Sequence, residues 1–461
     1  MERAANFYSN KAYFSQLYQL AAPITLQNLL TASLGMAGNI MVGQLGDTAM
    51  AASSLAGQIF FLLILILFGI GSGSAMFTAQ LWGKKDIVNL RKVLGLCLAL
   101  GLAVATIFFL LSEFVPREMI GFFSTDPQVI VLGGNFLKLY AWAFLFFSVT
   151  SGFAAILRSI GEVKIPLFIT VAALGLNIIL SYGFIFGDLG LPKMGLLGAA
   201  LAAVIARAAE CLALVIAVYW IKSPIAASLE ALIKFDLNFI GQVFKPVLPV
   251  ILNELLWSTA ITMYNFVYAR IGTPSMAAMN IVATVDNLAF VPFMGLSSAV
   301  AIMAGNKIGA GESDSAYRDV GRTLGLTAII AVLVGLIVLA IKALVVGLYK
   351  VTPDVVVYAD HALIILSVSL VVRSQNMILI VGALRSGGDT RYSLFLDGLI
   401  IWFLGVPMAL LGGFILHLPV YWVYLMVMSE ELTKCILGLR RYFSRKWIHN
   451  LTQIRPSESP S

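Results

Sequence analysis

Charged side chains occur inside long apolar stretches in the second half of the sequence. Glu254, Asp286, Arg373 and Asp397 each fall in a different stretch. A charge within a membrane-spanning helix is costly, so such residues are candidates for function by default. Two neighbouring carboxylates either bind a cation or share a proton, because like charges resist being ionised together. We therefore expect these four residues to form an ion-coupling site.

The spacing of two acidic residues would allow them to meet. Glu254 lies about five helical turns before Gly272, and Asp286 lies about four turns after it. At about 1.5 Å per residue, their depths in two antiparallel helices differ by roughly 6 Å. Glu254 and Asp286 are thus candidate ligands of Na⁺, although a protonated Glu254 would serve H⁺ equally well. Amide oxygens could complete a Na⁺ site. The candidates for this are Asn253, Asn280 and Asn287.

Each of these charges also has a structural interpretation, which the sequence leaves open. Glu254 could pair with Arg373, and Arg373 is most simply a counter-ion for the acidic residues. Asp397 lies near the start of its stretch and could pair with Arg373 or face water. Arg207 and Glu210 are three residues apart, so we expect them to pair along one helix.

The composition places most of the chain in a lipid bilayer. Sixty per cent of the residues are hydrophobic, 11% are charged, and the mean hydropathy is +0.94. A soluble domain of 461 residues would need more charge on its surface. About 20 apolar residues span a bilayer as a helix, and a β-barrel would require alternating segments instead. The sequence predicts an all-α integral membrane protein with twelve transmembrane helices. Their expected positions are 17–44, 49–81, 91–115, 129–158, 163–187, 194–221, 244–271, 275–308, 319–345, 354–385, 391–416 and 419–440.

The basic residues predict the orientation of these helices. If the N-terminus is cytoplasmic, 22 Lys and Arg side chains lie on the cytoplasmic side and five on the other. This bias predicts that both termini are cytoplasmic, in a multi-pass protein of a bacterial or archaeal inner membrane. The net charge of +7 is therefore explained by topology, and we expect no nucleic-acid partner.

The two halves of the sequence resemble each other at one fixed offset. The shift that places Pro23 on Pro249 also places Asn39 on Asn265 and Gly46 on Gly272. Two parallel repeats of six helices predict two pseudo-twofold-related lobes with a cleft between them. The expected divisions are an N-lobe at 1–221, a cytoplasmic linker at 222–243, a C-lobe at 244–446 and a cytoplasmic tail at 447–461. Within the linker, 237–243 is expected to lie along the membrane interface as a separate amphipathic piece.

Several motifs resemble signatures of a known family. Residues 39–46, 195–202, 383–390 and the Gly-Val-Pro sequence at 405–407 are similar to those of prokaryotic multidrug and toxin extrusion (MATE) transporters. The resemblance covers roughly residues 15 to 445. It implies a V-shaped pair of six-helix lobes, and a secondary active antiporter that exports organic, often cationic compounds by alternating access. The coupling ion would be Na⁺ or H⁺, with no other cofactor, and we expect a monomer acting on a small organic substrate within the bilayer.

The family's acidic positions are only partly retained. Many relatives have aspartates at positions matching Gly38 and Ser181, and another branch has one matching Ser374. The glutamate of the seventh helix is present as Glu254. The resemblance therefore implies that a proton relay on N-lobe carboxylates is not expected here.

Amide and aromatic residues of the apolar stretches are the candidates for lining a substrate cleft. These are Asn39, Asn177, Trp257, Tyr264, Asn265 and Asn376. No nucleotide-binding Gly-x4-Gly-Lys-[Ser/Thr] loop is present in the sequence, and none of its three histidines lies beside a nucleophile in a catalytic spacing, so we do not expect an enzyme. The alternative function is a lipid-linked oligosaccharide flippase of the same superfamily, which usually has a more cationic cavity.

Overall fold

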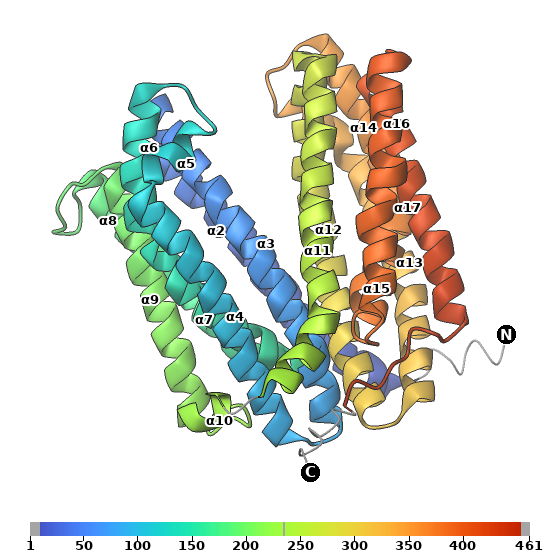
Figure 1. The fold of residues 1–461 in the computed structure, drawn as a ribbon. Coiled ribbons are helices and arrows are strands. Elements are labelled where there is room, and N and C mark those ends of the chain that lie inside the picture. The colour runs from blue at the N-terminus through green and yellow to red at the C-terminus, as the bar shows by residue number, and fades with distance from the viewer. Residues whose placement is uncertain (1–9, 234–235, 453–461) are drawn as a thin grey trace. The chain divides into compact units, whose positions relative to one another are not determined.

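The computed structural model describes residues 10–233 and 236–452, which form helices joined by short loops (Figure 1). This part of the chain contains no β-strand. Ten of its helices are long and apolar enough to cross a membrane. Two more, α2 (Lys11–Gly43) and α17 (Val420–Phe443), are long enough but more polar. The predicted all-α membrane protein with twelve transmembrane helices is confirmed.

The observed helix bounds lie close to the expected ones. In the first half they are α2, α3 (Asp47–Gly83), α4 (Ile87–Phe114), α5 (Pro116–Gly121), α6 (Pro127–Tyr140), α7 (Trp142–Ser159), α8 (Lys164–Phe186), α9 (Leu196–Trp220) and α10 (Leu229–Ile233). Helices α6 and α7 are separated by a single residue, Ala141, and correspond to one predicted segment.

The second half contains several π-helical turns. Its helices are α11 (Leu237–Ile271), α12 (Thr273–Gly309), α13 (Ser313–Gly347), α14 (Pro353–Met377), η1 (Ile378–Leu384), α15 (Thr390–Ser393), η2 (Leu394–Leu399), η3 (Ile401–Gly405), α16 (Val406–Leu410), η4 (Leu411–Ile415) and α17. The segment from α15 to η4 is one continuous membrane-spanning run. Such π-turns are frequent at functional sites, and this run carries Asp397.

The described chain divides into two compact units. The N-terminal unit comprises residues 26–78 and 85–243, and the C-terminal unit comprises 10–25, 79–84 and 244–452. The first turns of α2 and the last turn of α3 thus belong with the C-terminal helices. One reason is Gln80, whose amide nitrogen donates to the backbone oxygen of Ser386 at 2.8 Å and whose amide oxygen accepts from the backbone nitrogen of Leu451 at 2.7 Å.

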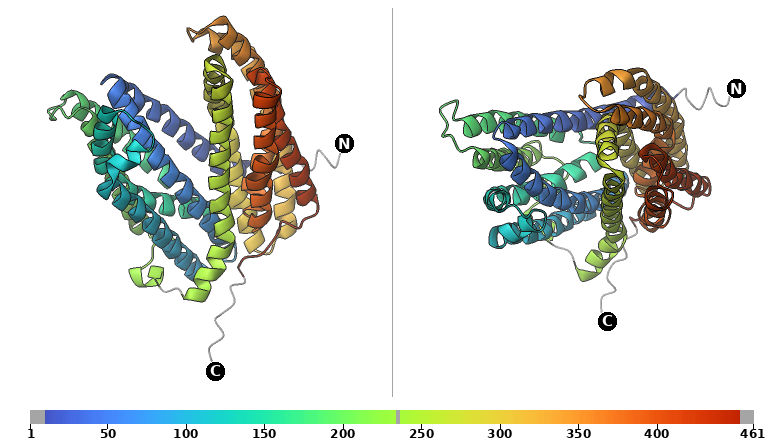
Figure 2. Two further views of the ribbon diagram at one scale, coloured as in Figure 1. Left: turned by 45° about the horizontal axis from the view of Figure 1, so that its top comes forward. Right: turned by 90° about the horizontal axis from the view of Figure 1, so that it is seen from above.

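Close helix contacts within the N-terminal unit depend on small residues. Helices α8 and α9 lie side by side, as Figures 1 and 2 show. A Cβ atom added to Gly198 on α9 would lie 2.6 Å from the backbone oxygen of Phe184, so only glycine allows this approach. Helix α8 ends at Gly187, whose φ of 82° is in the left-handed region that glycine adopts without strain.

The start of α11 differs from the expected separate interfacial piece at 237–243. The backbone nitrogen of Phe239 donates to a carboxylate oxygen of Asp236 at 2.7 Å, which caps a helix at this point. From Leu237 the helix then continues to Ile271 through Pro246 and Pro249. The expectation of a separate piece was wrong, because the cap precedes this segment and neither proline ends the helix.

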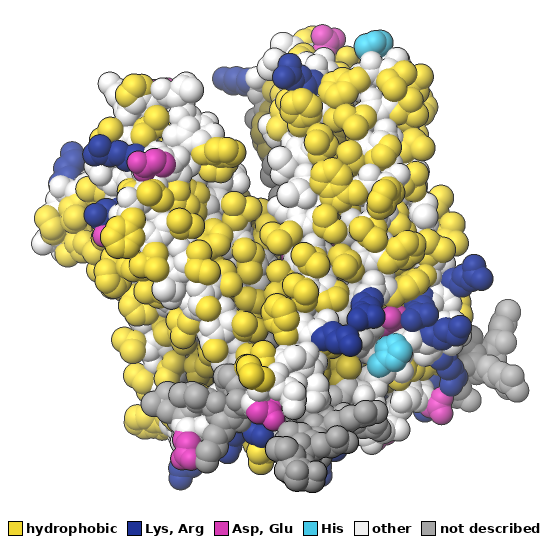
Figure 3. Space-filling view, in the orientation of Figure 1, with side chains coloured by type: hydrophobic (Ala, Val, Ile, Leu, Met, Phe, Trp, Pro, Cys, Tyr) yellow, Lys and Arg dark blue, Asp and Glu magenta, His cyan; other side chains and the backbone are white. Residues whose placement is uncertain are grey.

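The surface agrees with a membrane location. In Figure 3, hydrophobic side chains cover the middle of the long helices, and charged side chains gather toward their ends. A lipid-exposed helix needs this distribution, because charged groups are costly at the bilayer centre.

Candidate functional site

The first ion pair of the C-terminal unit joins Glu254 to Arg385. Glu254 lies on α11, and Arg385 directly follows η1, where its backbone nitrogen donates to Ile380 in a π-type bond of 3.2 Å. Nη2 of Arg385 is 2.8 Å from Oε1 of Glu254. The side chains of Arg385 and Glu254 are only 4% and 11% exposed, respectively. Because water cannot screen the pair, each charge depends on the other.

A second ion pair joins Asp286 on α12 to Arg373 on α14. The guanidinium group donates from Nη1 to Oδ1 at 2.7 Å and from Nη2 to Oδ2 at 2.9 Å. Arg373 also lies 5.1 Å above the ring of Phe290. This two-pronged geometry fixes both side chains. Glu254 and Asp286 therefore pair with different arginines, and Arg373 is a counter-ion of Asp286.

A third group of charges surrounds Lys434 on α17. Its ammonium nitrogen is 3.2 Å from Oδ1 of Asp397, 3.6 Å from Oε2 of Glu430 and 4.0 Å from Oε1 of Glu431. Asn253 donates to the other oxygen of Asp397 at 2.9 Å. Lys434 is almost fully buried, so one cation serves three carboxylates.

Glu430, Glu431 and Lys434 were not among the predicted site residues. The apolar run at 419–440 predicts an ordinary membrane-spanning helix, and Lys434 lies in its second half, toward the end expected to be cytoplasmic. The sequence did contain a signal for these residues, because three charged residues within five positions of an apolar run indicate a functional site. We call the three groups of charges described above the C-terminal network. It consists of Glu254, Asp286, Arg373, Arg385, Asp397, Glu430, Glu431 and Lys434. Five carboxylates and three basic groups leave an excess of two negative charges when all are ionised.

Several buried polar atoms beside the network have no hydrogen-bond partner among the described residues. They are Oε2 of Glu430, Oη of Tyr264 and the amide oxygens of Asn253 and Asn376. All four residues are buried. A buried polar atom without a partner costs free energy, and these are oxygens, which attract cations or hydrogen-bond donors.

The other predicted amides and aromatics lie in varied surroundings. Asn376 donates to the backbone oxygen of Glu431 at 2.8 Å and to its Oε2 at 2.7 Å. The exposed candidates are Asn265, Asn280, Asn287 and, at 38%, Trp257. No group of three His, Cys, Asp or Glu side chains within the described ranges could hold a metal ion. The Na⁺ ligand set predicted around Glu254 and Asp286 stays a prediction.

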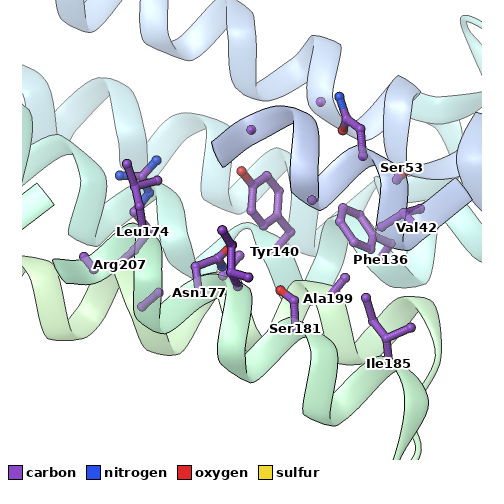
Figure 4. Close-up of a pocket in the computed structure, with 18 of the residues that line it drawn as sticks. Val42, Ser53, Phe136, Tyr140, Leu174, Asn177, Ser181, Ile185, Ala199 and Arg207 are labelled. Carbon is purple, nitrogen blue, oxygen red and sulfur yellow. The ribbon is translucent and has the colours of Figure 1, made fainter. Parts of the chain in front are cut away.

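The N-terminal unit contains a pocket of about 510 Å³ between α2, α3, α6, α8 and α9. Two predicted cleft residues, Asn39 and Asn177, line it. Figure 4 shows the rings of Phe136 and Tyr140 at this pocket, together with the side chains of Asn177 and Ser181. The ring of Tyr140 packs edge-on against Phe60 with centroids 5.3 Å apart, which fixes its place in the wall.

The charges of this pocket come from one ion pair. Nη1 of Arg207 is 2.7 Å from Oε2 of Glu210, as their spacing on α9 predicted. Arg207 also lies 4.9 Å above the ring of Phe147. Gly38 and Ser181, where many relatives have aspartates, line the same pocket. The described wall is thus balanced in charge and combines aliphatic, aromatic and polar side chains.

The MatE family model matches the chain twice, at residues 23–183 and 249–411. The two matches begin at the positions of Pro23 and Pro249, so they have the same offset that aligned the two halves of the sequence. The chain is 26% identical over 391 residues to a probable multidrug resistance protein, YoeA of Bacillus subtilis, and the match covers 84% of each protein.

Solved structures of the same fold are similar over nearly the whole chain. A mutant of the Vibrio cholerae MATE transporter VcmN matches with a TM-score of 0.86 and 18% identity, covering 95% of this chain and 98% of that one. A MOP superfamily transporter from Pyrococcus furiosus, described as having a binding pocket of reverse polarity, matches with a TM-score of 0.81 and 19% identity, covering 96% of both chains.

Proposed function

This chain belongs to the MatE family of multidrug and toxin extrusion transporters, and we propose that it exports organic cations in exchange for an inward-moving H⁺ or Na⁺. Membership makes it a multi-pass membrane transporter of small molecules rather than a member of an enzyme family. The direction of coupling, the ion and the charge of the substrate are the parts that we propose.

The observation that carries the proposal is the charge excess of the C-terminal network. When all eight groups are ionised, two negative charges of this partly buried network are uncompensated, which is costly because ions lose hydration in a low-dielectric interior. A cation that enters the network would remove part of this cost. When the cation leaves, the cost returns, and this difference can drive a conformational change. The network therefore has the property that a coupling site requires.

The ion pairs argue against Na⁺ at Glu254 and Asp286. Glu254 and Asp286 each have an arginine within hydrogen-bond distance. Na⁺ at either carboxylate would lie beside a guanidinium group of the same charge. The same guanidinium group favours the ionised form of its carboxylate, so a coupling proton would bind more readily at a network carboxylate that has no arginine. The transport assay described below decides between the two ions.

The pocket of the N-terminal unit supports an organic substrate. Its volume is within the range of small-molecule sites, and it combines aromatic rings with a few convergent polar groups. The ring faces of Phe136 and Tyr140 suit flat cations. Arg207 is neutralised by Glu210, so the wall is not basic. This disfavours the alternative, a lipid-linked oligosaccharide flippase, for which an anionic substrate would require a basic wall.

Transport in proteoliposomes tests the proposal. The purified protein is reconstituted, and efflux of the fluorescent cation ethidium is followed under an H⁺ gradient, under a Na⁺ gradient and with neither. We expect an H⁺ gradient to drive efflux and a Na⁺ gradient to have no effect. If neither gradient drives efflux, the antiporter proposal fails; if only Na⁺ does, the choice of ion fails.

A variant of the pocket tests the substrate site separately. Replacing Asn177 by Ala removes a polar group from the pocket wall, and ethidium binding should weaken by about tenfold, the value of one hydrogen bond of ~1.4 kcal/mol. Asn238→Ala, at an exposed position in the first turn of α11 and outside the pocket, is the matched control. Equal affinity of both variants for ethidium would place the substrate elsewhere.

The orientation and the divisions of the chain also belong to the proposal. We propose cytoplasmic termini, a linker at 222–243 and lobes at 1–221 and 244–446. The buried Trp447 shows that the segment expected to be a tail begins against the C-terminal unit. Labelling of a cysteine introduced at Lys11, with a membrane-impermeant maleimide in intact cells and in inverted vesicles, tests the side of the N-terminus.

A further inference from the structure

We propose that Glu430 on α17 is the group that binds the coupling proton, with Tyr264 as its hydrogen-bonding partner and Lys434 as the cation that compensates it when the proton has left. This inference rests on the proposed exchange of a substrate for H⁺. It assigns that exchange to a helix and a residue that the family resemblance did not single out.

Glu430 is the carboxylate with the fewest partners in the C-terminal network. Glu254 and Asp286 each have an arginine, Asp397 accepts from Asn253, and Glu431 accepts from Asn376. Oε2 of Glu430 has no hydrogen-bond partner among the described residues. Its contact with Lys434, at 3.6 Å, is longer than a hydrogen bond, and Asp397 lies closer to that ammonium group, at 3.2 Å.

The free oxygen of Glu430 faces a second unpartnered group. A Cβ atom added to Gly405 at the end of η3 would overlap both Tyr264 Oη and Glu430 Oε2, so both atoms lie against this glycine. Tyr264 Oη is also buried and without a partner in the described chain. Two oxygens from different helices are thus directed to one place. The Tyr264 hydroxyl group can donate to the ionised carboxylate or accept from the protonated carboxyl group, so small shifts of the side chains would close a hydrogen bond in either state.

The groups around Glu430 determine how the net charge of the network changes when the proton binds and leaves. The titratable groups that interact with Glu430 are Tyr264 and Tyr268 on α11, Asp397 on η2, and Glu431 and Lys434 on α17 itself. Arg373, Tyr424 and Cys435 interact with the neighbouring Glu431. When the proton binds, an O–H bond forms at Oε2 and the charge excess of the network falls from two to one. When the proton leaves, the electron pair stays on the carboxylate. Lys434 is then the only basic group within 4 Å among the described residues.

A proton suits this place better than Na⁺. A metal ion would lie close to the Lys434 ammonium group, which has the same charge. It would also need several oxygens at once, and the described residues contain no cluster of acidic ligands that could hold a metal. A proton needs neither a cavity nor a coordination shell. The geometry therefore fits a protonatable carboxyl group.

Infrared difference spectroscopy of the purified protein tests this assignment without any substrate. A carboxyl group that loses its proton loses its C=O absorption band, so a pH titration reports buried acids directly. We expect one such band to titrate in the wild-type protein and to be absent from Glu430→Gln. Glu113→Gln on α4 carries the same chemical change beside Lys138, in the N-terminal unit. It is the matched control and should keep the band.

A second variant covers the case in which Glu430→Gln does not fold. Tyr264→Phe removes only the facing hydroxyl group, so it should move the frequency of the band without abolishing it. An unchanged band in Glu430→Gln, or an unmoved band in Tyr264→Phe, would overturn the proposal. So would a shift of the titration midpoint by Na⁺, since Na⁺ would then compete for the site.

Transport separates this inference from the proposed function. In proteoliposomes, Glu430→Gln should lose H⁺-driven ethidium accumulation at least tenfold, but should still allow ethidium to move down its own gradient. If wild-type protein titrates the Glu430 band but moves no ethidium, the proposed substrate is wrong and the proton site stands. If wild-type transport is H⁺-driven and Glu430→Gln keeps it, the site is wrong and the proposed function stands.

Discussion

Breaking the Glu254–Arg385 pair one partner at a time should destabilise the protein strongly. The two side chains are nearly excluded from water and lie 2.8 Å apart, so each single substitution leaves one buried charge without its counter-ion. Removing one partner of a buried pair costs about 3–5 kcal/mol. At about 2–4 °C per kcal/mol for a unit of this size, the midpoint of thermal unfolding should fall by roughly 6–20 °C.

The two single substitutions should differ in their dependence on pH. Arg385→Met leaves a carboxyl group that can take up a proton, whereas Glu254→Gln leaves a guanidinium group that cannot lose one. Two further nitrogens of Arg385, Nε and Nη1, already lack partners in the described chain. We therefore expect Glu254→Gln to cause the larger loss of stability. Only the loss in Arg385→Met should shrink as the pH falls, because protonation removes the unpaired charge.

The double variant measures the coupling between the two residues. Glu254→Gln with Arg385→Met removes both charges, so it should recover at least about 2 kcal/mol relative to the sum of the single losses. The assay is thermal unfolding in detergent, followed by tryptophan fluorescence and by size-exclusion chromatography. Asp314→Asn, which breaks an exposed pair with Arg445, is the control and should cost about 0–1 kcal/mol. Additive losses in the double variant would refute the reasoning.

Three further substitutions test other parts of the structure. Gly198→Ala should destabilise the N-terminal unit by about 1–3 kcal/mol in thermal unfolding, because the added Cβ would meet the backbone of α8. Gly175→Ala is the control: no atom lies within 4 Å of its new Cβ, so this substitution should be neutral or stabilising. Equal effects of the two substitutions on stability would contradict the close contact at Gly198. Asp286→Asn should cost about 1–3 kcal/mol, reduced by the partial exposure of the pair, and its unfolding midpoint should become less sensitive to salt. Glu210→Gln should leave the pocket with a net positive charge. At an assumed separation of about 8 Å and an effective dielectric constant of about 20, the Coulomb repulsion is about 2 kcal/mol, so ethidium binding should weaken by roughly thirtyfold. Unchanged affinity would exclude this pocket as the cation site.

The helices of this protein could be predicted because each membrane-spanning segment is a local property of the sequence. A run of about 20 apolar residues must form a helix in lipid whatever its neighbours are. The duplication was also visible, since Pro23 and Pro249 keep their place at the offset at which the family model matches twice. The start of α11 was missed, because Asp236 caps the helix before the segment that was expected to stand alone.

The candidate site was only partly predictable. The sequence pointed to Glu254, Asp286 and Asp397 as unusual charges inside apolar runs, and the structure places all three in ion pairs. It could not say that Glu254 pairs with Arg385 instead of Arg373, because Arg385 is the last residue of the expected helix at 354–385 and is interpreted as a cytoplasmic basic residue. The charges of α17 were not predicted as site residues, because the sequence does not show that they face the other charges. Position along a helix gives depth, but not the face on which a side chain lies.

The sequence by itself determined that this chain crosses a membrane twelve times in two similar halves, because hydropathy and repetition depend only on the order of residues. Only the tertiary structure decided which charges compensate each other. That choice depends on how neighbouring helices are rotated and on where glycines such as Gly405 allow them to approach. In a low-dielectric interior the energy of a charge depends on atoms within a few ångströms. For this reason the unpartnered oxygen of Glu430 became visible only in the folded chain.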